Sequence, residues 1–212
     1  MILSQRERVT DAEGRARVPE VSLYFQNRLF RANRSTKQSA ERLSAFASFN
    51  YPPLAEVGVN IAYNDAAIHH PAEGEEFGVE SSLACDVMVV KIFPGLTEQT
   101  LNAMLSVEGL RGVILETYGS GNAPSGDWFI GSLRRAMERG VCVMNVTQCA
   151  DGKVDMELYE TGRRMQELGV VSGRDITLEA AVTKMMFMLG RGVSGEALKS
   201  ALRTSFKGEM NE

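Results

Sequence analysis

From residue 84 onward, apolar runs of strand length alternate with amphipathic segments of helix length. The pattern predicts strands over 85–93, 112–119 and 141–149, with helices over 97–106 and 127–140 between them. Three further helices are expected over 156–168, 178–189 and 194–203, the last two with Thr177 and Ser194 as N-caps. This order of elements is typical of a parallel sheet covered by helices on both faces.

The first third of the chain has a weaker pattern. It predicts a strand over 18–25, a short helix over 37–46 and a short strand over 58–63. Residues 64–82 lose all periodicity and gain acidic and turn residues, which indicates a linker. Two or three strands and one helix are too few to bury a sheet. We therefore expect residues 1–63 to be the remnant of a larger N-terminal domain and 83–212 to be a complete three-layer α/β domain.

Composition limits the class of protein. The 212 residues are 44% hydrophobic and 24% charged, which suits one or two globular domains with a real core. A net charge of −4 argues against nucleic acid or an anionic membrane as a partner. The chain lacks an apolar stretch of about 18 residues, and its N-terminus lacks the apolar region of a signal peptide. We therefore expect a cytoplasmic protein.

The cysteines and histidines do not form a recognisable catalytic or metal motif. Cys85, Cys142 and Cys149 are odd in number and lack C-x-x-C spacing, so we expect reduced thiols in or near a core. His69 and His70 are adjacent in the predicted linker, with no carboxylate or cysteine cluster at a metal spacing, and are expected to be solvated. The chain has no G-x-S-x-G motif, and its cysteines lack a histidine partner. Neither a metal nor a cofactor is expected.

The stretch ETYGSGNAPSGDWF (116–129) is the best candidate for a site. It contains Gly119 and Gly121, but Pro124 stands where a dinucleotide-binding fingerprint needs its third glycine. No G-K-[ST] follows, so a phosphate-binding loop is disfavoured. Loops at the carboxyl ends of parallel strands commonly bind ligands, and the Asn122 amide is able to donate and accept hydrogen bonds. The alternative, which the spacing alone favours, is an ordinary turn with Asn122 in a left-handed conformation.

Lys37 stands in NRSTKQSAE, at the start of a predicted helix. A lysine in this position is usually a solvated charge, and the nearby Arg28, Arg31 and Arg34 are equally consistent with a solvated face. The polar runs 48–53 and 145–155 lie at predicted strand ends and could line a pocket. By themselves these residues name no reaction.

Several consecutive segments resemble the cytoplasmic type I L-asparaginases. VPEVSLYFQNRLFRANRSTKQSAERLSAFASFNYPPLAEVGVNI (18–61) resembles the later part of their N-terminal domain. VVKIFPGLTEQTLNAMLSVEGLRGVILETYGSGNAP (89–124) and NVTQCADGKVDMELYETG (145–162) resemble their C-terminal domain. The resemblance implies hydrolysis of L-asparagine to L-aspartate and ammonia by a threonine nucleophile, through an acyl-enzyme. It also implies a homodimer or homotetramer that uses no cofactor.

The resemblance assigns roles to individual residues. Lys37 matches the lysine of a proton-handling triad that also contains a threonine and an aspartate, and its ammonium would keep the aspartate ionised. Asn122 matches the asparagine that one subunit lends to the active site of its neighbour. Thr36, Glu116 and Cys149 match positions of an allosteric asparagine site found in some bacterial members. An arginine is expected where Glu116 stands, and a carboxylate there would repel the ligand's carboxylate. We therefore do not expect allosteric control by asparagine.

The chain departs from the family in lacking the nucleophile. Neither the T-G-G-T motif nor the G-T-D-T motif occurs among the 212 residues, and the first predicted strand corresponds to a position beyond both. We therefore expect a truncated asparaginase, roughly its last three-fifths, that is inactive by itself. Two alternatives remain. One is a non-catalytic module for assembly or small-molecule binding, and the other, disfavoured by the defects of the glycine loop, is a nucleotide-binding domain.

Overall fold

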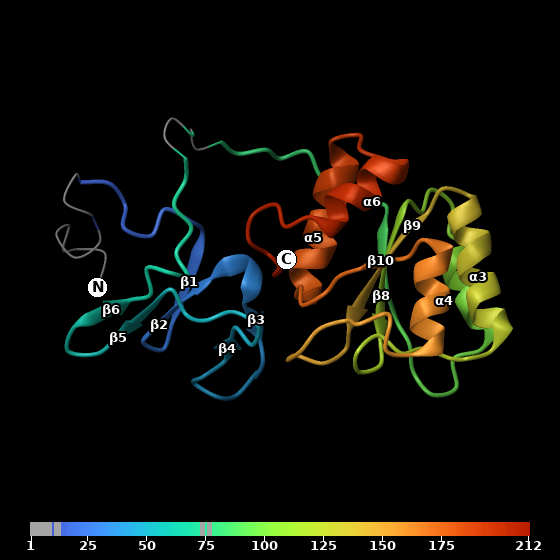
Figure 1. The fold of residues 1–212 in the computed structure, drawn as a ribbon, viewed down its shortest axis with the longest axis horizontal. Helices are drawn as coiled ribbons and strands as arrows, with labels where there is room; N and C mark the ends of the chain where they lie inside the picture. Colours follow the sequence, from blue (N-terminus) through green and yellow to red (C-terminus); the bar gives the residue numbers. More distant parts are fainter. Residues whose placement is uncertain (1–9, 11–13, 73–74, 76–77) are drawn as a thin grey trace. The chain divides into compact units, whose positions relative to one another are not determined.

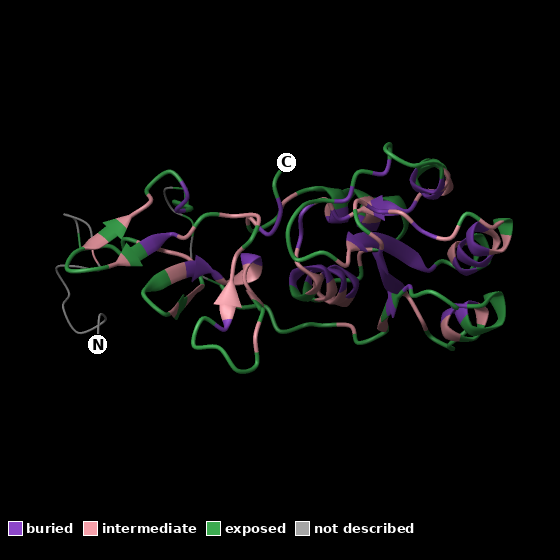
Figure 2. Ribbon diagram, turned by 90° about the horizontal axis from the view of Figure 1, so that it is seen from below, coloured by how far each residue is buried: buried purple, intermediate pink, exposed green. Residues whose placement is uncertain are grey.

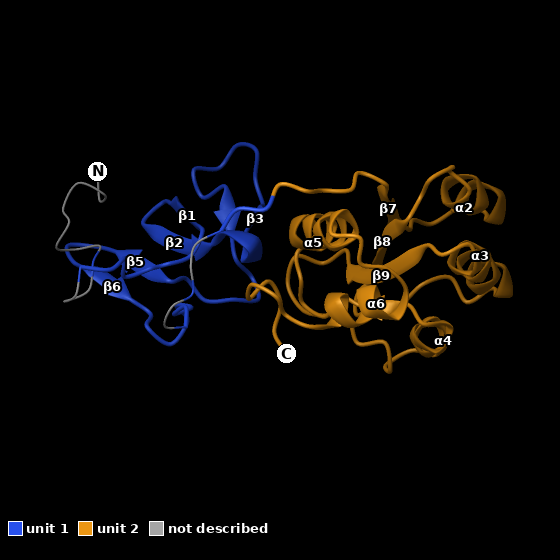
Figure 3. Ribbon diagram, turned by 90° about the horizontal axis from the view of Figure 1, so that it is seen from above, with its two compact units in different colours: residues 1–80 blue, residues 81–212 orange. Residues whose placement is uncertain are grey.

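The computed structural model describes residues 10, 14–72, 75 and 78–212. The chain divides into two compact units, residues 1–80 (unit 1) and 81–212 (unit 2), which are coloured separately in Figure 3. The division between them falls inside the stretch 64–82. The expected absence of a signal peptide concerns the N-terminus of the chain. Residues 1–9 and 11–13 of that region lie outside the described part.

Unit 2 is built on a parallel sheet. Its strands are β7 (Val87–Lys91), β8 (Gly112–Thr117), β9 (Cys142–Thr147) and β10 (Val171–Ser172), in the order β10-β9-β8-β7. Strands that follow one another in the chain are also neighbours in the sheet and run parallel. The connections are α2 (Glu98–Leu105), α3 (Asp127–Glu138) and α4 (Glu160–Leu168); α3 and α4 are labelled in Figure 1, and all three in Figure 3. The predicted α/β class is confirmed, although the short β10 was not predicted.

Helices cover both faces of this sheet. Val113, Leu115 and Val143 belong to the hydrophobic cluster that includes residues of α2, α3 and α4. The alternate residues Ile114 and Met144 belong to the cluster with α5 (Leu178–Gly190) and α6 (Gly195–Arg203). Because successive side chains of a strand point to opposite faces, the apolar runs fill both layers. Figure 2 shows the buried strands between the helices.

Most predicted boundaries in unit 2 agree with the structure to within two residues. The Thr177 side chain accepts a hydrogen bond from the Ala180 amide, which confirms it as an N-cap. Ser194 occupies the N-cap position of α6, but its side chain makes no capping bond. The helix predicted over 156–168 begins only at Glu160, because Asp155 Oδ1 accepts from the Glu157 amide and forms a turn instead.

Unit 1 contains short antiparallel strands. One sheet has the order β1 (Ser22–Phe25), β2 (Arg28–Arg31), β5 (Ala55–Val57), β6 (Ile61–Tyr63). A 3-10 turn, η2 (Ala32–Arg34), leads to β3 (Thr36–Lys37), which pairs with β4 (Phe46–Ala47). The buried core of this unit is small and centres on Leu54, Ala67 and Ile68.

The helix predicted over 37–46 is wrong. Ser39 Oγ accepts from the amides of Glu41 and Arg42, and this local bonding competes with a helix. The Gln38 amide donates to Ala45 O at 2.8 Å, which closes a β3–β4 hairpin. Leu43 is 84% exposed, so the segment has no buried apolar face to stabilise a helix.

The strand predicted over 18–25 begins only at Ser22, and β2 and β5 were not predicted. The turn between β1 and β2 has Gln26 and Asn27 at φ 46° and 63°. Two consecutive positive φ values are typical of the tight turns that match the twist of antiparallel strands. The turn therefore gives β1 and β2 their register.

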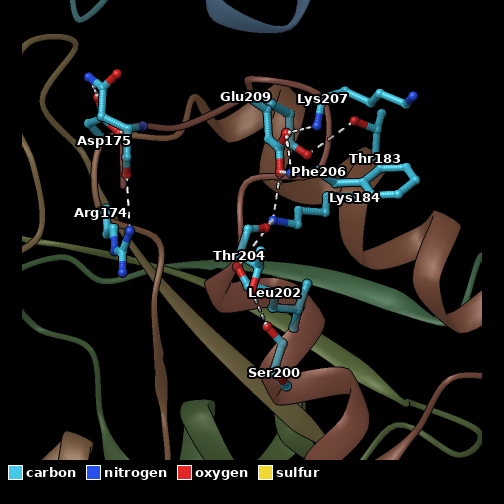
Figure 4. A network of polar contacts seen from close by, with 12 residues as sticks. Arg174, Asp175, Thr183, Lys184, Ser200, Leu202, Thr204, Phe206, Lys207 and Glu209 are labelled. Atoms are coloured by element: carbon cyan, nitrogen blue, oxygen red, sulfur yellow. Dashed lines mark hydrogen bonds and ion pairs between the residues drawn. The ribbon is translucent and has the colours of Figure 1, made fainter. Parts of the chain in front are cut away.

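A buried ion pair joins α5 to the chain that follows α6 (Figure 4). Lys184 Nζ lies 2.6 Å from Glu209 Oε1, 2.6 Å from Thr204 O and 3.2 Å from Leu202 O. Three acceptors match the three N–H groups of an ammonium, so Lys184 is charged here. The bonds to Leu202 and Thr204 also satisfy carbonyls at the end of α6 that lack helical partners.

Burial and hydrogen bonding both act on this pair. Burial lowers the pKa of Lys184, against the effect of its bond to Glu209. Burial by itself would raise the pKa of Glu209, but hydrogen bonds from Lys184 and from the amides of Phe206 and Lys207 outweigh it and lower that pKa. The carboxylate thus holds the 206–209 turn as well as the ammonium.

The first prediction concerns the stability of unit 2. Lys184→Met leaves Glu209 buried without its counter-ion and is expected to lower the free energy of unfolding by about 3–5 kcal/mol. Lys184→Met combined with Glu209→Gln is expected to cost less than the single Lys184 variant. Urea unfolding followed by the fluorescence of Trp128, the only tryptophan and a residue of α3, measures this. A double variant no more stable than Lys184→Met would contradict the pairing.

The second prediction is a pH dependence. Because the folded-state pKa of Glu209 lies below its ordinary value of 4.5, its stabilising contribution is complete above that pH. The contribution is lost as the pH falls through the lower folded-state pKa. Between about pH 7 and about pH 3 the free energy of unfolding should therefore fall more steeply for the natural chain than for Glu209→Gln. Equal slopes in urea titrations would show that Glu209 does not titrate differently in the folded unit.

Candidate functional site

The glycine loop after β8 is a closed hairpin. Tyr118 and Asn122 form a β-bridge, with Tyr118 N donating to Asn122 O and Asn122 N donating to Tyr118 O, both at 2.8 Å. Gly121 N also donates to Tyr118 O, at 3.0 Å. A phosphate site needs free amides at a helix start, but these amides bond within the loop and α3 begins only at Asp127. The geometry agrees with the exclusion of a phosphate-binding loop.

The two glycines adopt the left-handed backbone conformation that the hairpin requires. Gly119 has φ 48° and Gly121 has φ 107°, whereas Asn122 has no positive φ. The expectation that Asn122 would be left-handed in an ordinary turn is therefore wrong. Glycine adopts a positive φ without steric strain because it has no Cβ, so the hairpin does not require a positive φ at Asn122.

The side chain of Asn122 is half-buried and bonded on one side only. Its Oδ1 accepts from the Ala123 amide at 2.9 Å, which fixes the orientation of the side-chain amide. Within the described residues, its Nδ2 group has no protein partner. Two N–H donors are therefore available to a ligand that carries an oxygen acceptor.

Gly119 and Ser120 accept hydrogen bonds from outside the loop, and Gly121 has little free space beside it. Thr147 Oγ1 donates to Gly119 O at 2.6 Å, and the Asp155 amide donates to Ser120 O at 2.8 Å. A Cβ on Gly121 would lie 2.9 Å from Val154 Cγ1 and 3.3 Å from Asn145 Nδ2. The loop therefore rests directly on β9 and on the segment that follows it.

A buried polar pair under the loop was missed by the sequence reasoning. Thr117 and Asn145 are both 0% exposed, and Thr117 Oγ1 donates to Asn145 Oδ1 at 2.7 Å. In the sequence, the pair is indicated by the asparagine that interrupts the apolar run VCVMNV. Such a residue in a doubly covered strand needs a hydrogen-bond partner.

Glu116 and Cys149 lie at the same edge of the sheet as Asn122. Glu116 ends up 9% exposed, and its carboxylate lies 3.7 Å from Lys91 Nζ on the adjacent strand. The Gln148 side chain joins the strand ends by donating to Glu116 O and Ile92 O. Cys149 is exposed, with its amide bonded to Thr147 Oγ1. The carboxyl ends of β8 and β9 thus bring three of the predicted positions together.

Lys37 and Thr36 belong to unit 1, where they form β3. Lys37 is exposed and Thr36 is half-buried. The preceding turn is fixed by Arg34, which is 2% exposed and donates to Asn50 O. Arg31 and Arg34 both stack on the Tyr51 ring, at 4.5 Å and 5.1 Å. The solvated face suggested by the sequence is therefore wrong for these two arginines, which instead support the backbone leading to Lys37.

All three cysteines are free thiols, but only one of them lies in the core. Cys142 is buried, and burial raises its pKa to about 11. Cys85 and Cys149 are exposed, which contradicts a place in the core. His69 and His70 are exposed as well. Among the residues that the structure describes, no group of three or more His, Cys, Asp and Glu side chains is arranged to hold a metal ion.

None of the described helices is both long enough and apolar enough to span a bilayer.

Unit 1 has a hollow of about 770 Å³ between the β1–β2 turn, β4 and β5, lined in part by Phe25, Phe30, Phe46 and Phe49. Val21 and Val59 of the same unit are 73% and 96% exposed. Unit 1 thus leaves apolar surface uncovered.

The sequence matches two known family descriptions over most of its length. The description "Glutaminase/Asparaginase C-terminal domain" matches residues 86–202, more than half of the chain, and "Asparaginase, N-terminal" matches residues 8–69. The chain belongs to the glutaminase/asparaginase family. Both matched stretches contain residues singled out above: Lys37 lies in the first along the chain, and Glu116, Asn122 and Cys149 lie in the second.

Individual asparaginase-family proteins are similar over most of the chain. It is 38% identical over 193 residues to "L-asparaginase 1" of Escherichia coli (strain K12), covering 91% of this chain and 56% of that protein. It is 40% identical over 194 residues to "60 kDa lysophospholipase" of Mus musculus, covering 91% of this chain and 34% of that protein. The chain thus spans about half or less of the length of these curated relatives.

A solved asparaginase has the same fold. The crystal structure of L-asparaginase I from Vibrio cholerae O1 biovar eltor str. N16961 superposes with a TM-score of 0.83 at 37% identity. The match covers 93% of this chain and 59% of that one. Both units therefore have counterparts in a single asparaginase chain.

The third prediction tests the packing of the loop. Gly121→Ala introduces a Cβ at φ 107°, against Val154, and is expected to destabilise unit 2 by about 1–3 kcal/mol. The matched control is Gly131→Ala in the middle of α3, which meets only the tip of the Arg135 side chain and should be neutral or stabilising, by up to about 1 kcal/mol. Urea unfolding followed by Trp128 fluorescence compares the two. Equal effects would mean that the loop is not constrained as described.

Proposed function

We propose that this chain provides part of an L-asparaginase, an amidohydrolase that converts L-asparagine and water to L-aspartate and ammonia. Support comes from the family membership and from the closed glycine loop, which leaves the Nδ2 group of Asn122 without a protein partner. A substrate carboxylate or carboxamide oxygen would accept hydrogen bonds from it. The observation that carries the proposal is this oriented Asn122 amide at the carboxyl end of β8.

Asn122 is proposed as a substrate-binding residue of a neighbouring subunit's site. Its own unit offers a single half-buried amide at the sheet edge, and a complete site needs further groups. Assembly as a homodimer or homotetramer in the cytoplasm would supply them, as the resemblance implies. The uncovered apolar surface of unit 1, including Val59 and the hollow beside β4, is consistent with further chain packing there.

Lys37 is proposed as the catalytic lysine. It is exposed on β3, at the end of a segment that the buried Arg34 and the half-buried Tyr51 hold in place. An ammonium in this position would stabilise an ionised aspartate and favour removal of a hydroxyl proton from threonine. The reaction would then pass through an acyl-enzyme whose oxyanion is stabilised by backbone donors.

The nucleophile itself is not among these residues. Because neither T-G-G-T nor G-T-D-T occurs in the 212 residues, we propose that they are inactive without a segment that carries both motifs. The curated relatives and the solved asparaginase extend well beyond the matched region, in line with such a segment.

Allosteric control by asparagine is proposed to be absent. Thr36, Glu116 and Cys149 would be the corresponding pocket positions, and Glu116 presents a carboxylate where an arginine would clamp the ligand. Lys91 lies 3.7 Å from this carboxylate and compensates its charge, but it cannot offer a bidentate fork.

The second candidate function is a non-catalytic module for assembly or small-molecule binding. It is favoured by the completeness of unit 2, whose sheet is covered on both faces without any contribution from the nucleophile segment. Such a domain would fold and assemble without catalysing a reaction. Turnover distinguishes the two candidates.

The fourth prediction is the turnover itself. The 212-residue chain is expected to release no ammonia from L-asparagine alone and to release it after addition of a separately produced segment carrying the threonine motifs. In the reconstituted enzyme, Lys37→Met and Asn122→Ala should each lower kcat/KM by about 100-fold or more. The control variants are Lys199→Met, which removes an exposed ion pair on α6, and Asn102→Ala on the surface of α2.

The outcomes separate the candidates. Activity of the 212 residues alone would overturn the assignment of the missing nucleophile. Absence of activity in the mixture, with both parts folded and associated, would favour the non-catalytic module. Equal losses in the Lys37 and Lys199 variants would remove Lys37 from the mechanism.

A further inference from the structure

The fully buried Thr117–Asn145 pair lies directly beneath the loop that carries Asn122. Thr117 is the last residue of β8 and Asn145 lies in β9, and both side chains are 0% exposed. Their side chains point to the same face of the sheet as Leu115 and Val143, which pack on α2, α3 and α4. Both residues thus place polar groups at the rim of an apolar layer.

The hydrogen bonds of Thr117 determine which way the Asn145 amide faces. Thr117 Oγ1 lies 2.7 Å from Asn145 Oδ1 and 3.3 Å from Val146 O, and donates toward both. Because Oδ1 is the end of the amide that accepts, Nδ2 is directed away from Thr117. It lies beneath Gly121, where a Cβ would come within 3.3 Å of it.

The Nδ2 group has no hydrogen-bond partner in the described residues, although it is buried. A buried donor without a partner lowers stability, since its bonds to water are lost on folding. A leucine of similar size would avoid this cost. The amide is therefore better explained by its effect on the loop than by its contribution to the core.

We propose that Thr117 and Asn145 are positioning residues, which support Gly121 and thereby hold the Asn122 amide in its binding orientation. The proposal rests on the proposed role of Asn122 as a substrate-binding residue. Gly121 and Asn122 are consecutive, and both their amides donate to Tyr118 O. A shift of Gly121 toward β9 or away from it would therefore break the pairing that orients Asn122.

The first arm of the test measures the loop without any turnover. Thr117→Val keeps the shape of the side chain and removes only the hydroxyl, so the Asn145 amide is free to turn. Hydrogen exchange of the Gly121 and Asn122 amides in the 212-residue chain should become faster by about tenfold or more. Thr117→Ser retains the hydroxyl and should restore slow exchange. The control Thr183→Val removes a hydroxyl bonded only within α5 and should leave both amides unchanged.

The second arm measures coupling to Asn122 in the reconstituted enzyme. Thr117→Val should lower kcat/KM by about tenfold when Asn122 is present, and by less than about twofold in an Asn122→Ala background. A purely structural role would give the same loss in both backgrounds. Should Thr117→Val fail to fold, Asn145→Leu serves as the second variant, with the same expected faster exchange and an unfolding midpoint equal to or higher than that of the natural chain.

Unchanged exchange in Thr117→Val and in Asn145→Leu would overturn the proposal, as would equal activity losses with and without Asn122. An inactive reconstituted natural chain would instead be evidence against the proposed asparaginase function. In that case the exchange measurements still decide whether the pair holds the loop.

Discussion

Strand β8 is buried along its whole length on both faces, and the organisation of unit 2 depends on this burial. Val113 and Leu115 need one layer of helices and Ile114 needs the other, so the sheet is stable only with both layers present. The last residue of the strand, Thr117, lies in the same dry environment. Its hydroxyl must therefore bond to protein groups, and it donates to the side chain of Asn145 on the neighbouring strand. The constraint that forms the core thus extends to the base of the candidate site.

The long elements of unit 2 could be predicted because their apolar residues recur over whole strands and helices. Burial on both faces gives the uninterrupted run of β8, and burial on one face gives the spacing of Phe129, Leu133 and Ala136 in α3. In unit 1 the strands are only two to four residues long, too short for a period to be recognised. The prediction of a helix over 37–46 was wrong because the hydrogen bonds that Ser39 accepts from Glu41 and Arg42 depend on backbone geometry, which composition does not reveal.

The candidate site could also be predicted only in part. The position of the glycine loop follows from the end of a strand, and the positions of Lys37 and Asn122 follow from the family resemblance. The closure of the loop through Tyr118, and the support from Thr117 and Asn145, could not be predicted because they depend on the register between β8 and β9. Glu116 illustrates the same limit. Its charge is evident from the sequence, whereas its compensation by Lys91 depends on the pairing of β7 with β8.

The order of strands in unit 2 has a consequence for ligand binding. In many α/β sheets the order of strands reverses, and the two loops at the reversal diverge and leave a crevice for a ligand. Here the spatial order follows the chain order, and the described sheet has no such reversal. A ligand at Asn122 therefore needs a second wall from outside the sheet. For a site of this kind, ligand binding and assembly are thermodynamically linked, so each strengthens the other by the same factor. If Asn122 binds substrate as proposed, the concentration of the protein would therefore affect its affinity for substrate.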